Sequence, residues 1–243
     1  MSFPKIIHSI SPADKSKWHS SWSMCNDSWF QHFDSREFQF KIWDDEYSLE
    51  NFVRNFYPEF LDSYLLLPHK IMKIDIARLL ILHKFGGIYR DMDYYVLKNF
   101  YYYVCNLSKK YKTKQHNFFV GSASKGIAHE TVSNFIMVSE KNCSLLYYMA
   151  DWFLTLINKI RETPFYSVIE QNKNPCVSAL TGPLIMSSSM LIVMDAKKGD
   201  DLNYYLLDSS LFNPDYSNSL SQTEKVFNEN VFGKHLGSAV WIK

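Results

Sequence analysis

Two aspartates, Asp91 and Asp93, are the residues of this chain whose type and spacing point most directly to chemistry. On an extended backbone, residues two apart send their side chains to the same face, so both carboxylates are expected to bind one cation. Oxygen ligands suit Mg²⁺ and Mn²⁺, and such an ion neutralises the charge that develops on a leaving diphosphate. An Asp-x-Asp pair is also common on protein surfaces, so the residues around it decide between the two interpretations.

A second pair of charges, Asp75 and Arg78, lies three positions apart in an apolar run that predicts a helix over 69–85. Residues at this spacing share one face of a helix, so the pair has two interpretations. It forms an ordinary intrahelical salt bridge, or Arg78 binds a phosphate or sugar while Asp75 accepts hydrogen bonds from sugar hydroxyls. The apolar character of the helix favours the second interpretation, because two charges on such a helix need partners.

The elements around these charges follow one another in the order of an α/β protein. The helix over 69–85 ends at Gly86-Gly87, which accept the left-handed backbone that closes a helix, and a strand over 88–90 leads directly to Asp91. Further strands are predicted over 5–10, 38–43, 117–121 and 134–138, and further helices over 49–60 and 145–160. Residues 195–222 have the composition of turns and loops, and 232–243 that of a tail that folds back onto the body.

The composition excludes several classes of protein. The 243 residues are 47% hydrophobic and 16% aromatic, which is enough to bury the core of one domain over 1–243. Lys and Arg number 26 against 25 Asp and Glu, so no nucleic-acid partner is expected. Four scattered cysteines indicate reduced thiols. No signal sequence or transmembrane segment is recognised, so we expect a cytoplasmic protein, at most peripheral at the inner membrane face.

Motifs spread along the chain are shared with one known family. Residues 4–8 (PKIIH), 42–45 (IWDD) and 73–89, which end in GGIY, precede Asp91-Met92-Asp93 in that order. Further on come 134–139, the segment 181–183 (TGP), and 235–241, which runs from a His to a Trp. Together these motifs resemble the glycosyltransferases with a DXD-containing sugar-binding region, which include yeast initiating α-1,6-mannosyltransferases, bacterial capsule and lipooligosaccharide transferases and, remotely, clostridial glucosylating toxins. The resemblance is dense over 4–100 and sparse over 101–180.

The resemblance implies a GT-A fold, which is a Rossmann-like α/β/α sandwich with a mostly parallel central sheet. Residues 1–100 would form the nucleotide-sugar-binding half, and 101–243 the acceptor side and a closing tail. The implied metal ligands are Asp91, Asp93 and His235, and the implied catalytic residues are Asp75, Arg78, Asp91, Asp93 and Asn134. Donor contacts are implied for Ile7, His8, Trp43, Asp75, Arg78, Tyr89, Asp91, Ser238 and Trp241. For His8 and Trp43, packing in the core is the alternative interpretation, and His235 taken alone is equally compatible with an ordinary histidine.

The implied activity is metal-dependent transfer of a hexose or N-acetylhexosamine, with retention of configuration, from a nucleotide diphosphate sugar to a glycan of a capsule, lipopolysaccharide or glycoprotein. The expected cofactor is Mn²⁺ or Mg²⁺, and the expected donor is a UDP-sugar, with GDP-mannose next. Two other hypotheses stay open: an effector or toxin that glycosylates a protein, and a non-catalytic module that binds a nucleotide sugar or carbohydrate. A phosphotransferase with an aspartate nucleophile fits less well, because Tyr95 stands where its Asp-x-Asp-x-Thr motif needs Thr or Val.

Overall fold

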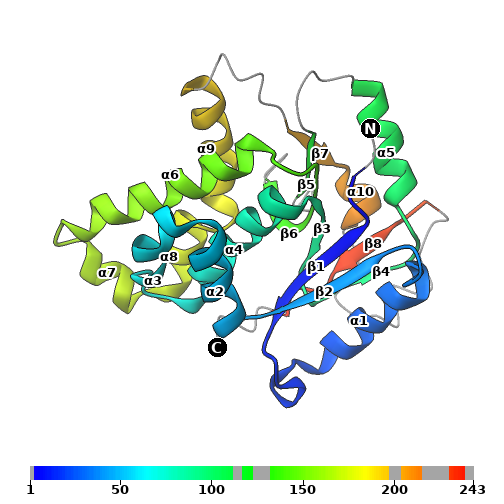
Figure 1. Cartoon of the computed structure of the whole chain (residues 1–243), viewed down its shortest axis with the longest axis horizontal. Coiled ribbons are helices and arrows are strands. Elements are labelled where there is room, and N and C mark those ends of the chain that lie inside the picture. Colours follow the sequence, from blue (N-terminus) through cyan, green and yellow to red (C-terminus); the bar gives the residue numbers. More distant parts are fainter. Residues whose placement is uncertain (1–2, 112–116, 123–131, 197–203, 215–229, 239–243) are drawn as a thin grey trace.

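A six-stranded mixed sheet forms the centre of the molecule (Figure 1). The computed structural model describes residues 3–111, 117–122, 132–196, 204–214 and 230–238. In spatial order the sheet consists of β2 (Gln39–Asp44), β1 (Ile6–Ser11), β3 (Gly87–Arg90), β6 (Val132–Ser139), β5 (Phe118–Ser122) and β7 (Tyr205–Leu207). The β2–β1, β1–β3 and β5–β7 pairs are parallel, whereas β6 runs antiparallel to both of its neighbours. A small antiparallel sheet pairs β4 (Tyr94–Val96) with β8 (Gly233–His235).

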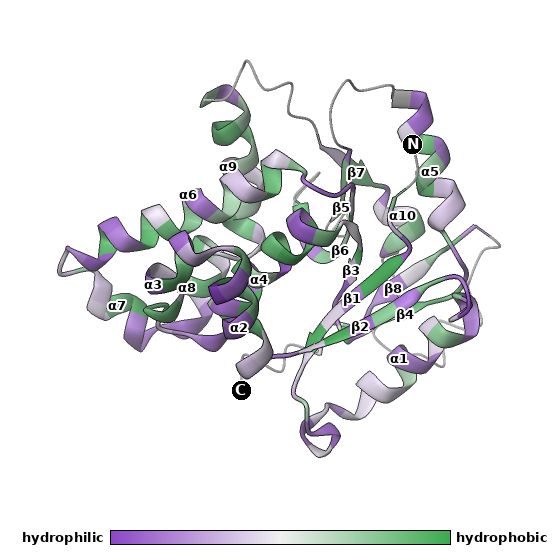
Figure 2. Cartoon of the chain, in the orientation of Figure 1, coloured by the Kyte–Doolittle hydropathy of each residue, from purple (hydrophilic) through white to green (hydrophobic). Residues whose placement is uncertain are grey.

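Helices cover both faces of the large sheet, and each face has its own hydrophobic core (Figures 1 and 2). The first core includes α2 (Tyr47–Phe56), α3 (Leu61–Leu65), α4 (Lys70–Phe85), α6 (Ser144–Arg161), α7 (Tyr166–Gln171), α8 (Lys173–Leu180) and α9 (Pro183–Ala196). The second includes α1 (Ser20–His32), α5 (Tyr101–Tyr111) and α10 (Ser209–Phe212). Neighbouring residues of β3 enter opposite cores, Tyr89 the first and Ile88 the second, as the alternation of a strand requires. The expected α/β/α sandwich with a mostly parallel sheet is confirmed.

The junction between α4 and β3 places the Asp-x-Asp segment, as the sequence predicts. α4 ends at Gly86, which has φ +65°, and Gly87 follows with φ +94°. A Cβ atom on Gly87 would lie only 2.3 Å from the carbonyl oxygen of Ile6, so this position requires glycine. The close approach sets β3 beside β1, and because the two strands are parallel, Asp91 emerges at the edge where β1 also ends.

The expectation of a loop over 195–222 is wrong for the part of this range that the structure describes. α9 extends to Ala196, β7 pairs with β5, and α10 buries Phe212. β7 and α10 have only 3 and 4 residues, so tertiary contacts rather than composition determine them. α1 and α5 are helices that the sequence analysis does not anticipate, because their apolar residues are interrupted by many polar ones.

One apolar stretch among the described residues, Lys173–Ala196, has the length and composition of a membrane-spanning helix. In the structure it consists of α8 and α9, which are separated by Thr181 and Gly182. Of its most apolar window, 44% is buried inside the molecule. Core helices share this composition, so the stretch is weak support for a membrane span, and the expected absence of such a segment stays a prediction.

Candidate active site

A cavity of about 430 Å³ lies where β1, β2 and β3 end. Because these parallel strands end at one edge of the sheet, the residues that follow them, Pro12, Asp45 and Asp91, line the same cavity. The strands themselves contribute Ile10 and Tyr89. Further lining comes from α1, α4, β6, α8, the start of α9, and the end of β8 with the residues after it, and includes Trp22, Lys70, Ile74, Asp75, Arg78, Asn134, Val177, Pro183, His235 and Ser238. The carboxyl edge of a parallel sheet is where α/β proteins commonly bind ligands.

The two aspartates of the Asp-x-Asp motif converge through a turn and not through an extended strand. β3 ends at Arg90, and the backbone N–H of Tyr94 donates to the carbonyl of Asp91 at 3.1 Å, which closes a turn over 91–94. Ligand atoms of Asp91, Asp93 and His235 nevertheless all lie within 4.8 Å of one another. The expected meeting of the two carboxylates is found, but the extended geometry expected for 91–93 is wrong.

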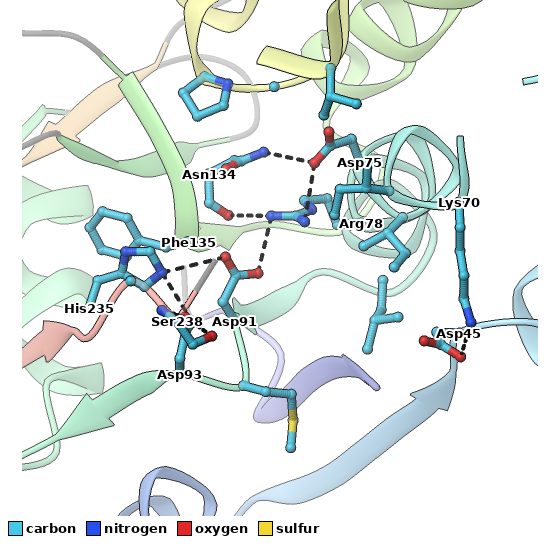
Figure 3. A pocket seen from close by; sticks show the side chains of 18 of the residues that line it. Asp45, Lys70, Asp75, Arg78, Asp91, Asp93, Asn134, Phe135, His235 and Ser238 are labelled. Atoms are coloured by element: carbon cyan, nitrogen blue, oxygen red, sulfur yellow. Dashed lines mark hydrogen bonds and ion pairs between the residues drawn. The ribbon is translucent and has the colours of Figure 1, made fainter. Parts of the chain in front are cut away.

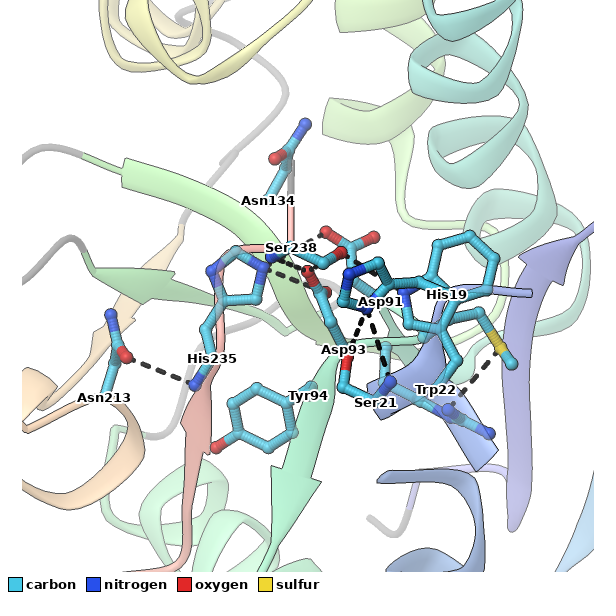
Figure 4. A network of polar contacts seen from close by, with 12 residues as sticks. His19, Ser21, Trp22, Asp91, Asp93, Tyr94, Asn134, Asn213, His235 and Ser238 are labelled. Atoms are coloured by element: carbon cyan, nitrogen blue, oxygen red, sulfur yellow. Dashed lines mark hydrogen bonds and ion pairs between the residues drawn. The ribbon is translucent and has the colours of Figure 1, made fainter. Parts of the chain in front are cut away.

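His235 reaches the aspartates because β8 pairs with β4, with His235 opposite Tyr94. Its Nε2 lies 3.1 Å from Oδ1 of Asp93 and 3.9 Å from Oδ2 of Asp91. The imidazole stacks on the ring of Phe135, with the centroids 4.7 Å apart and the planes 9° from parallel. Figures 3 and 4 show the imidazole directed at the two carboxylates. Strand pairing and ring stacking together orient this histidine.

Ser238 binds the other carboxylate oxygen of Asp93 (Figure 4). Both its backbone N–H and its hydroxyl donate to Oδ2 of Asp93 at 2.7 Å. The indole N–H of Trp22 donates to the same hydroxyl oxygen at 3.2 Å, which ties α1 to the closing segment. The sequence analysis did not identify Trp22, because this tryptophan stands in a polar stretch without a recognisable motif.

These contacts shift the acidity of Asp93 and His235 in opposite directions. Burial alone would raise the pKa of Asp93, but the hydrogen bond and charge of His235 and the two hydrogen bonds from Ser238 hold it well below its usual value. Burial opposes the charged form of His235, yet the hydrogen bond and charge of Asp93, helped by the charge of Asp91, raise its pKa. In the metal-free protein the pair is therefore an anion beside a histidine that tends to be protonated.

The donor set of Asp91, Asp93 and His235 fits a divalent ion. Carboxylate oxygens with one imidazole nitrogen suit Mn²⁺, and the carboxylates also suit Mg²⁺. A bound ion would take the place of the proton that His235 now directs at Asp93. The hydrogen bonds from Ser238 would then orient a metal-binding carboxylate, as outer-shell partners of metal ligands commonly do.

Asp75 and Arg78 form the second part of the site (Figure 3): their intrahelical salt bridge is confirmed, and the binding of a phosphate or sugar by this pair stays a prediction. Nη2 of Arg78 lies 3.1 Å from Oδ1 of Asp75, so the intrahelical salt bridge exists. Nη1 of Arg78 also contacts Oδ1 of Asp91 and donates to the backbone carbonyl of Asn134, both at 3.1 Å. Arg78 thus links α4 to the Asp-x-Asp turn and brings a positive charge to the cavity.

The carboxylate of Asp75 is held by neutral side chains as well. Asn134 donates its amide N–H to Oδ1 at 3.0 Å, and the hydroxyl of Thr181 donates to Oδ2 at 2.9 Å. Burial raises the pKa of Asp75 to about 6, although Arg78 and these hydrogen bonds act against the shift. Thr181 belongs to the TGP segment, but its hydrogen bond to Asp75 could not be read from the sequence.

Tyr89, in β3, contacts the turn over 91–94. Its hydroxyl donates to Oδ1 of Asp91 at 3.0 Å, and its ring packs against the guanidinium of Arg78 at 4.9 Å. Asp91 therefore accepts hydrogen bonds from two residues that the sequence analysis assigned to the donor site. Asp75, Arg78, Tyr89, Asp91, Asp93, Asn134, His235 and Ser238 all line one cavity.

Residues 19–115 match the family model described as a glycosyltransferase sugar-binding region containing a DXD motif. Over this region the chain is similar to the glycosyltransferases of the DXD family. The matched stretch contains Asp75, Arg78, Tyr89, Asp91 and Asp93. Asn134, Thr181, His235 and Ser238 lie outside it, although the structure brings them to the same site.

Several characterised proteins are similar over this glycosyltransferase region. Inositol phosphoceramide mannosyltransferase 3 of Schizosaccharomyces pombe is 36% identical over 92 residues, which are 37% of this chain and 24% of that protein. The initiation-specific alpha-1,6-mannosyltransferase of Saccharomyces cerevisiae is 34% identical over 89 residues, which are 35% of this chain and 18% of that protein. The matched stretch thus spans about a quarter or less of these relatives. A solved structure titled PaToxG Glycosyltransferase is similar with a TM-score of 0.48 and 16% identity, over 82% of this chain and 76% of that chain.

Three of the expected donor contacts do not reach the cavity. Ile7 is buried in the second core, and Trp43 is buried in the first. His8 is fully buried, with Nε2 3.0 Å from the carbonyl oxygen of Gly86 and Nδ1 accepting from the indole of Trp43 at 3.3 Å. The interpretation of these residues as donor contacts is corrected: they lie within β1 and β2, whereas the cavity opens beyond the ends of these strands. Trp241 lies outside the described residues, so its role stays a prediction.

Proposed function

We propose that this chain is a metal-dependent glycosyltransferase that moves a hexose from a nucleotide diphosphate sugar to a glycan acceptor. The observation that carries the proposal is the convergence of Asp91, Asp93 and His235 beside Arg78 in one cavity. Three metal-binding side chains next to a buried arginine suit a diphosphate group, because cations stabilise the negative charge that the departing group acquires. Mn²⁺ or Mg²⁺, when bound, would supply Lewis-acid stabilisation of that leaving group.

Arg78 and Asp75 would bind the phosphate and the sugar of the donor. Arg78 directs its guanidinium toward the turn that carries Asp91, where it would bind a phosphate oxygen. Asp75 is fixed by Arg78, Asn134 and Thr181, so its carboxylate is positioned to accept hydrogen bonds from hydroxyls of the transferred sugar. Side chains held in this way lose little freedom on binding, which favours a reactive alignment of donor and acceptor.

Transfer with retention of configuration is part of the proposal. The residues assembled at the site serve a metal, phosphate or sugar hydroxyls, and among the described lining residues none stands out as a dedicated nucleophile. A front-face displacement needs no such residue, because the departing diphosphate oxygen accepts the proton of the acceptor hydroxyl. Proton NMR of the product's anomeric centre tests this step: the configuration of the donor should persist, and an inverted product would contradict the proposal.

Among the transferable sugars, mannose ranks first. The matched relatives are named as mannosyltransferases, and the expectation from sequence includes both UDP-sugars and GDP-mannose. A glycan or an inositol-containing lipid is the acceptor class that the proposal favours, since one relative is named for inositol phosphoceramide. The cytoplasmic location expected from the sequence remains a prediction.

A donor panel tests the proposal directly. The chain would be incubated with UDP- and GDP-linked hexoses and N-acetylhexosamines, with Mn²⁺ or with a chelator, and released nucleotide would be measured. We expect release from one class of donor in the presence of Mn²⁺ only. Nucleotide-sugar binding without any release would support the non-catalytic binding module, and the absence of both would contradict a nucleotide-sugar site.

A further inference from the structure

The end of the cavity away from the metal-binding residues contains one charged pair that the proposed chemistry does not use. Nζ of Lys70 lies 2.8 Å from Oδ1 of Asp45 and 2.8 Å from Oε1 of Glu46. Lys70 and Asp45 both line the cavity. In Figure 3 they stand on the opposite side of Arg78 from His235, so the cavity has two chemically different ends.

One face of α4 connects the two ends. Lys70, Ile71, Ile74, Asp75 and Arg78 all line the cavity, in the order of a helix face. At a rise of 1.5 Å per residue, Lys70 stands about 12 Å along the helix axis from Arg78. A diphosphate placed at Arg78 and the Asp-x-Asp turn therefore leaves room along α4 for the nucleoside, with Ile71 and Ile74 beside it and the charged pair at its far edge.

Asp45 is built into this end of the cavity. It follows β2 directly, and its backbone N–H donates to the carbonyl of Ser11 at 3.1 Å, which fixes it beside the end of β1. Its side chain is only 10% exposed. Among the residues that the structure describes, Lys70 is the one partner of its carboxylate, through Oδ1. Its second oxygen is not among the buried atoms that lack a partner, so it is accessible and free to accept a donor from a ligand in the cavity.

We infer that Asp45 and Lys70 read the Watson–Crick edge of the donor's nucleobase and select guanine over uracil. Guanine presents two neighbouring N–H donors, N1–H and the 2-amino group, beside the acceptor O6. The carboxylate of Asp45 accepts from both donors, and the ammonium of Lys70 has a third N–H for O6, since Asp45 and Glu46 occupy two. Uracil presents one N–H between two carbonyl oxygens, so one of its oxygens would face the carboxylate. This inference rests on the proposed function and specifies its donor as a GDP-sugar.

The strength of the contact follows from its chemistry. A hydrogen bond to an ionised group contributes enough to binding for a ligand that lacks the donor to bind about tenfold to a hundredfold more weakly. Discrimination is stronger where a ligand places an acceptor against a buried acceptor, because both groups then lose solvation without a partner. Both UDP and a guanine analogue without the 2-amino group are therefore expected to bind more weakly than GDP. The loss of affinity should be larger for UDP.

Calorimetric titration of the chain with GDP, IDP and UDP in the presence of Mn²⁺ tests the inference. IDP differs from GDP only by the missing 2-amino group, so it isolates the contact with Asp45. For the wild type we expect GDP to bind at least about tenfold more tightly than IDP, and UDP to be the weakest of the three. Asp45→Asn should bring the affinities for GDP and IDP close together. Lys70→Met should weaken both by a similar factor and preserve their ratio, because both carry O6.

Glu50→Gln is the matched control, because it breaks the Glu50–Arg54 ion pair of 3.0 Å, which does not line the cavity. It should leave all three affinities unchanged. Equal binding of GDP and IDP by the wild type, tighter binding of UDP, or an unchanged GDP-to-IDP ratio in Asp45→Asn would each overturn the inference. Tight, metal-dependent binding of UDP would overturn the inference about guanine, but it would still support the proposed transferase function. If none of the three nucleotides binds, the proposed function fails together with the inference.

Discussion

Nε2 of His235 lies 3.1 Å from Oδ1 of Asp93, although the first residue lies near the end of the described chain and the second in its first half. The contact depends on the pairing of β8 with β4 and on the stacking of His235 against Phe135. A site assembled from both halves of the chain is complete only when β8 and the residues up to Ser238 are in place. Each part of this arrangement makes a separate prediction.

His235→Gln should weaken Mn²⁺ binding by at least about tenfold, since removal even of an outer-shell partner of a metal ligand has an effect of that size. Glutamine approximates the size of the side chain but lacks the imidazole nitrogen that faces Asp93. Titration calorimetry with Mn²⁺ measures the change. His32→Gln, at an exposed position at the end of α1, is the control and should bind Mn²⁺ as the wild type does. Equal affinities for His235→Gln and the control would remove His235 from the metal site.

Thr181→Val should destabilise the fold by about 1–3 kcal/mol, because it leaves one oxygen of the buried Asp75 without its hydrogen bond. Urea unfolding followed by circular dichroism measures the difference. Thr155→Val makes the same chemical change at an exposed position of α6 and should alter stability by less than about 0.5 kcal/mol. Similar small effects of the two substitutions would show that Thr181 does not support Asp75.

The raised pKa of Asp75 predicts a specific pH dependence of stability. The pKa of Asp75 is about 6 in the folded chain, against an ordinary value of 3.8 for an aspartate carboxyl group. The folded state therefore binds more protons than the unfolded state between these values, so this group stabilises the fold as the pH falls from about 7 to about 4. The difference corresponds to about 3 kcal/mol at most.

Comparison of the wild type with Asp75→Asn isolates this contribution. Over the same pH range, the wild type should gain stability relative to Asp75→Asn, which cannot titrate at this position. Urea unfolding at pH 7.5 and pH 4.5 measures both chains, with Asp151→Asn as an exposed control on α6. A constant difference in stability between the wild type and Asp75→Asn would mean that burial does not raise the pKa of Asp75.

Gly87→Ala should be strongly destabilising, whereas Gly237→Ala should be mild. Both glycines have positive φ, +94° and +60°, so alanine is strained at each. Of the two, only Gly87 would clash with the backbone: its added Cβ would lie 2.3 Å from the carbonyl oxygen of Ile6, whereas no atom lies within 4 Å of a Cβ on Gly237. We expect a cost of about 1 kcal/mol at Gly237 and several times that at Gly87. Equal unfolding free energies for the two variants would contradict the account of the α4–β3 junction.

Much of the site was predictable because its central residues are close in sequence. Asp75, Arg78, Tyr89, Asp91 and Asp93 follow one helix, one glycine stop and one strand, all of which have local signals. The structure confirms that these residues lie together. The metal-binding role of Asp91 and Asp93 stays a prediction, since their geometry only permits it.

The rest of the site depends on tertiary contacts that no local pattern encodes. Trp22 reaches Ser238 because α1 packs beside the small sheet, and Asp45 meets Lys70 because β2 ends near the start of α4. His8 and Trp43 were assigned to the donor site because they stand in segments that resemble family motifs. Both lie inside their strands, where they contact each other and do not line the cavity. Whether a strand residue reaches the cavity depends on how far it lies from the end of its strand, and the sequence does not reveal where the strand ends.

The most direct test of the central claim is nucleotide release from the best donor by the wild type and by Asp93→Asn, each with Mn²⁺ and with a chelator. Asp62→Asn, at an exposed position of α3, serves as the control for the loss of one carboxylate. The account predicts Mn²⁺-dependent release by the wild type and the control, and a loss of at least about a hundredfold in Asp93→Asn, a typical cost of removing one element of transition-state charge stabilisation. Release that is independent of Mn²⁺, or that persists at the wild-type rate in folded Asp93→Asn, would contradict the assignment of this cavity as a metal-dependent transferase site.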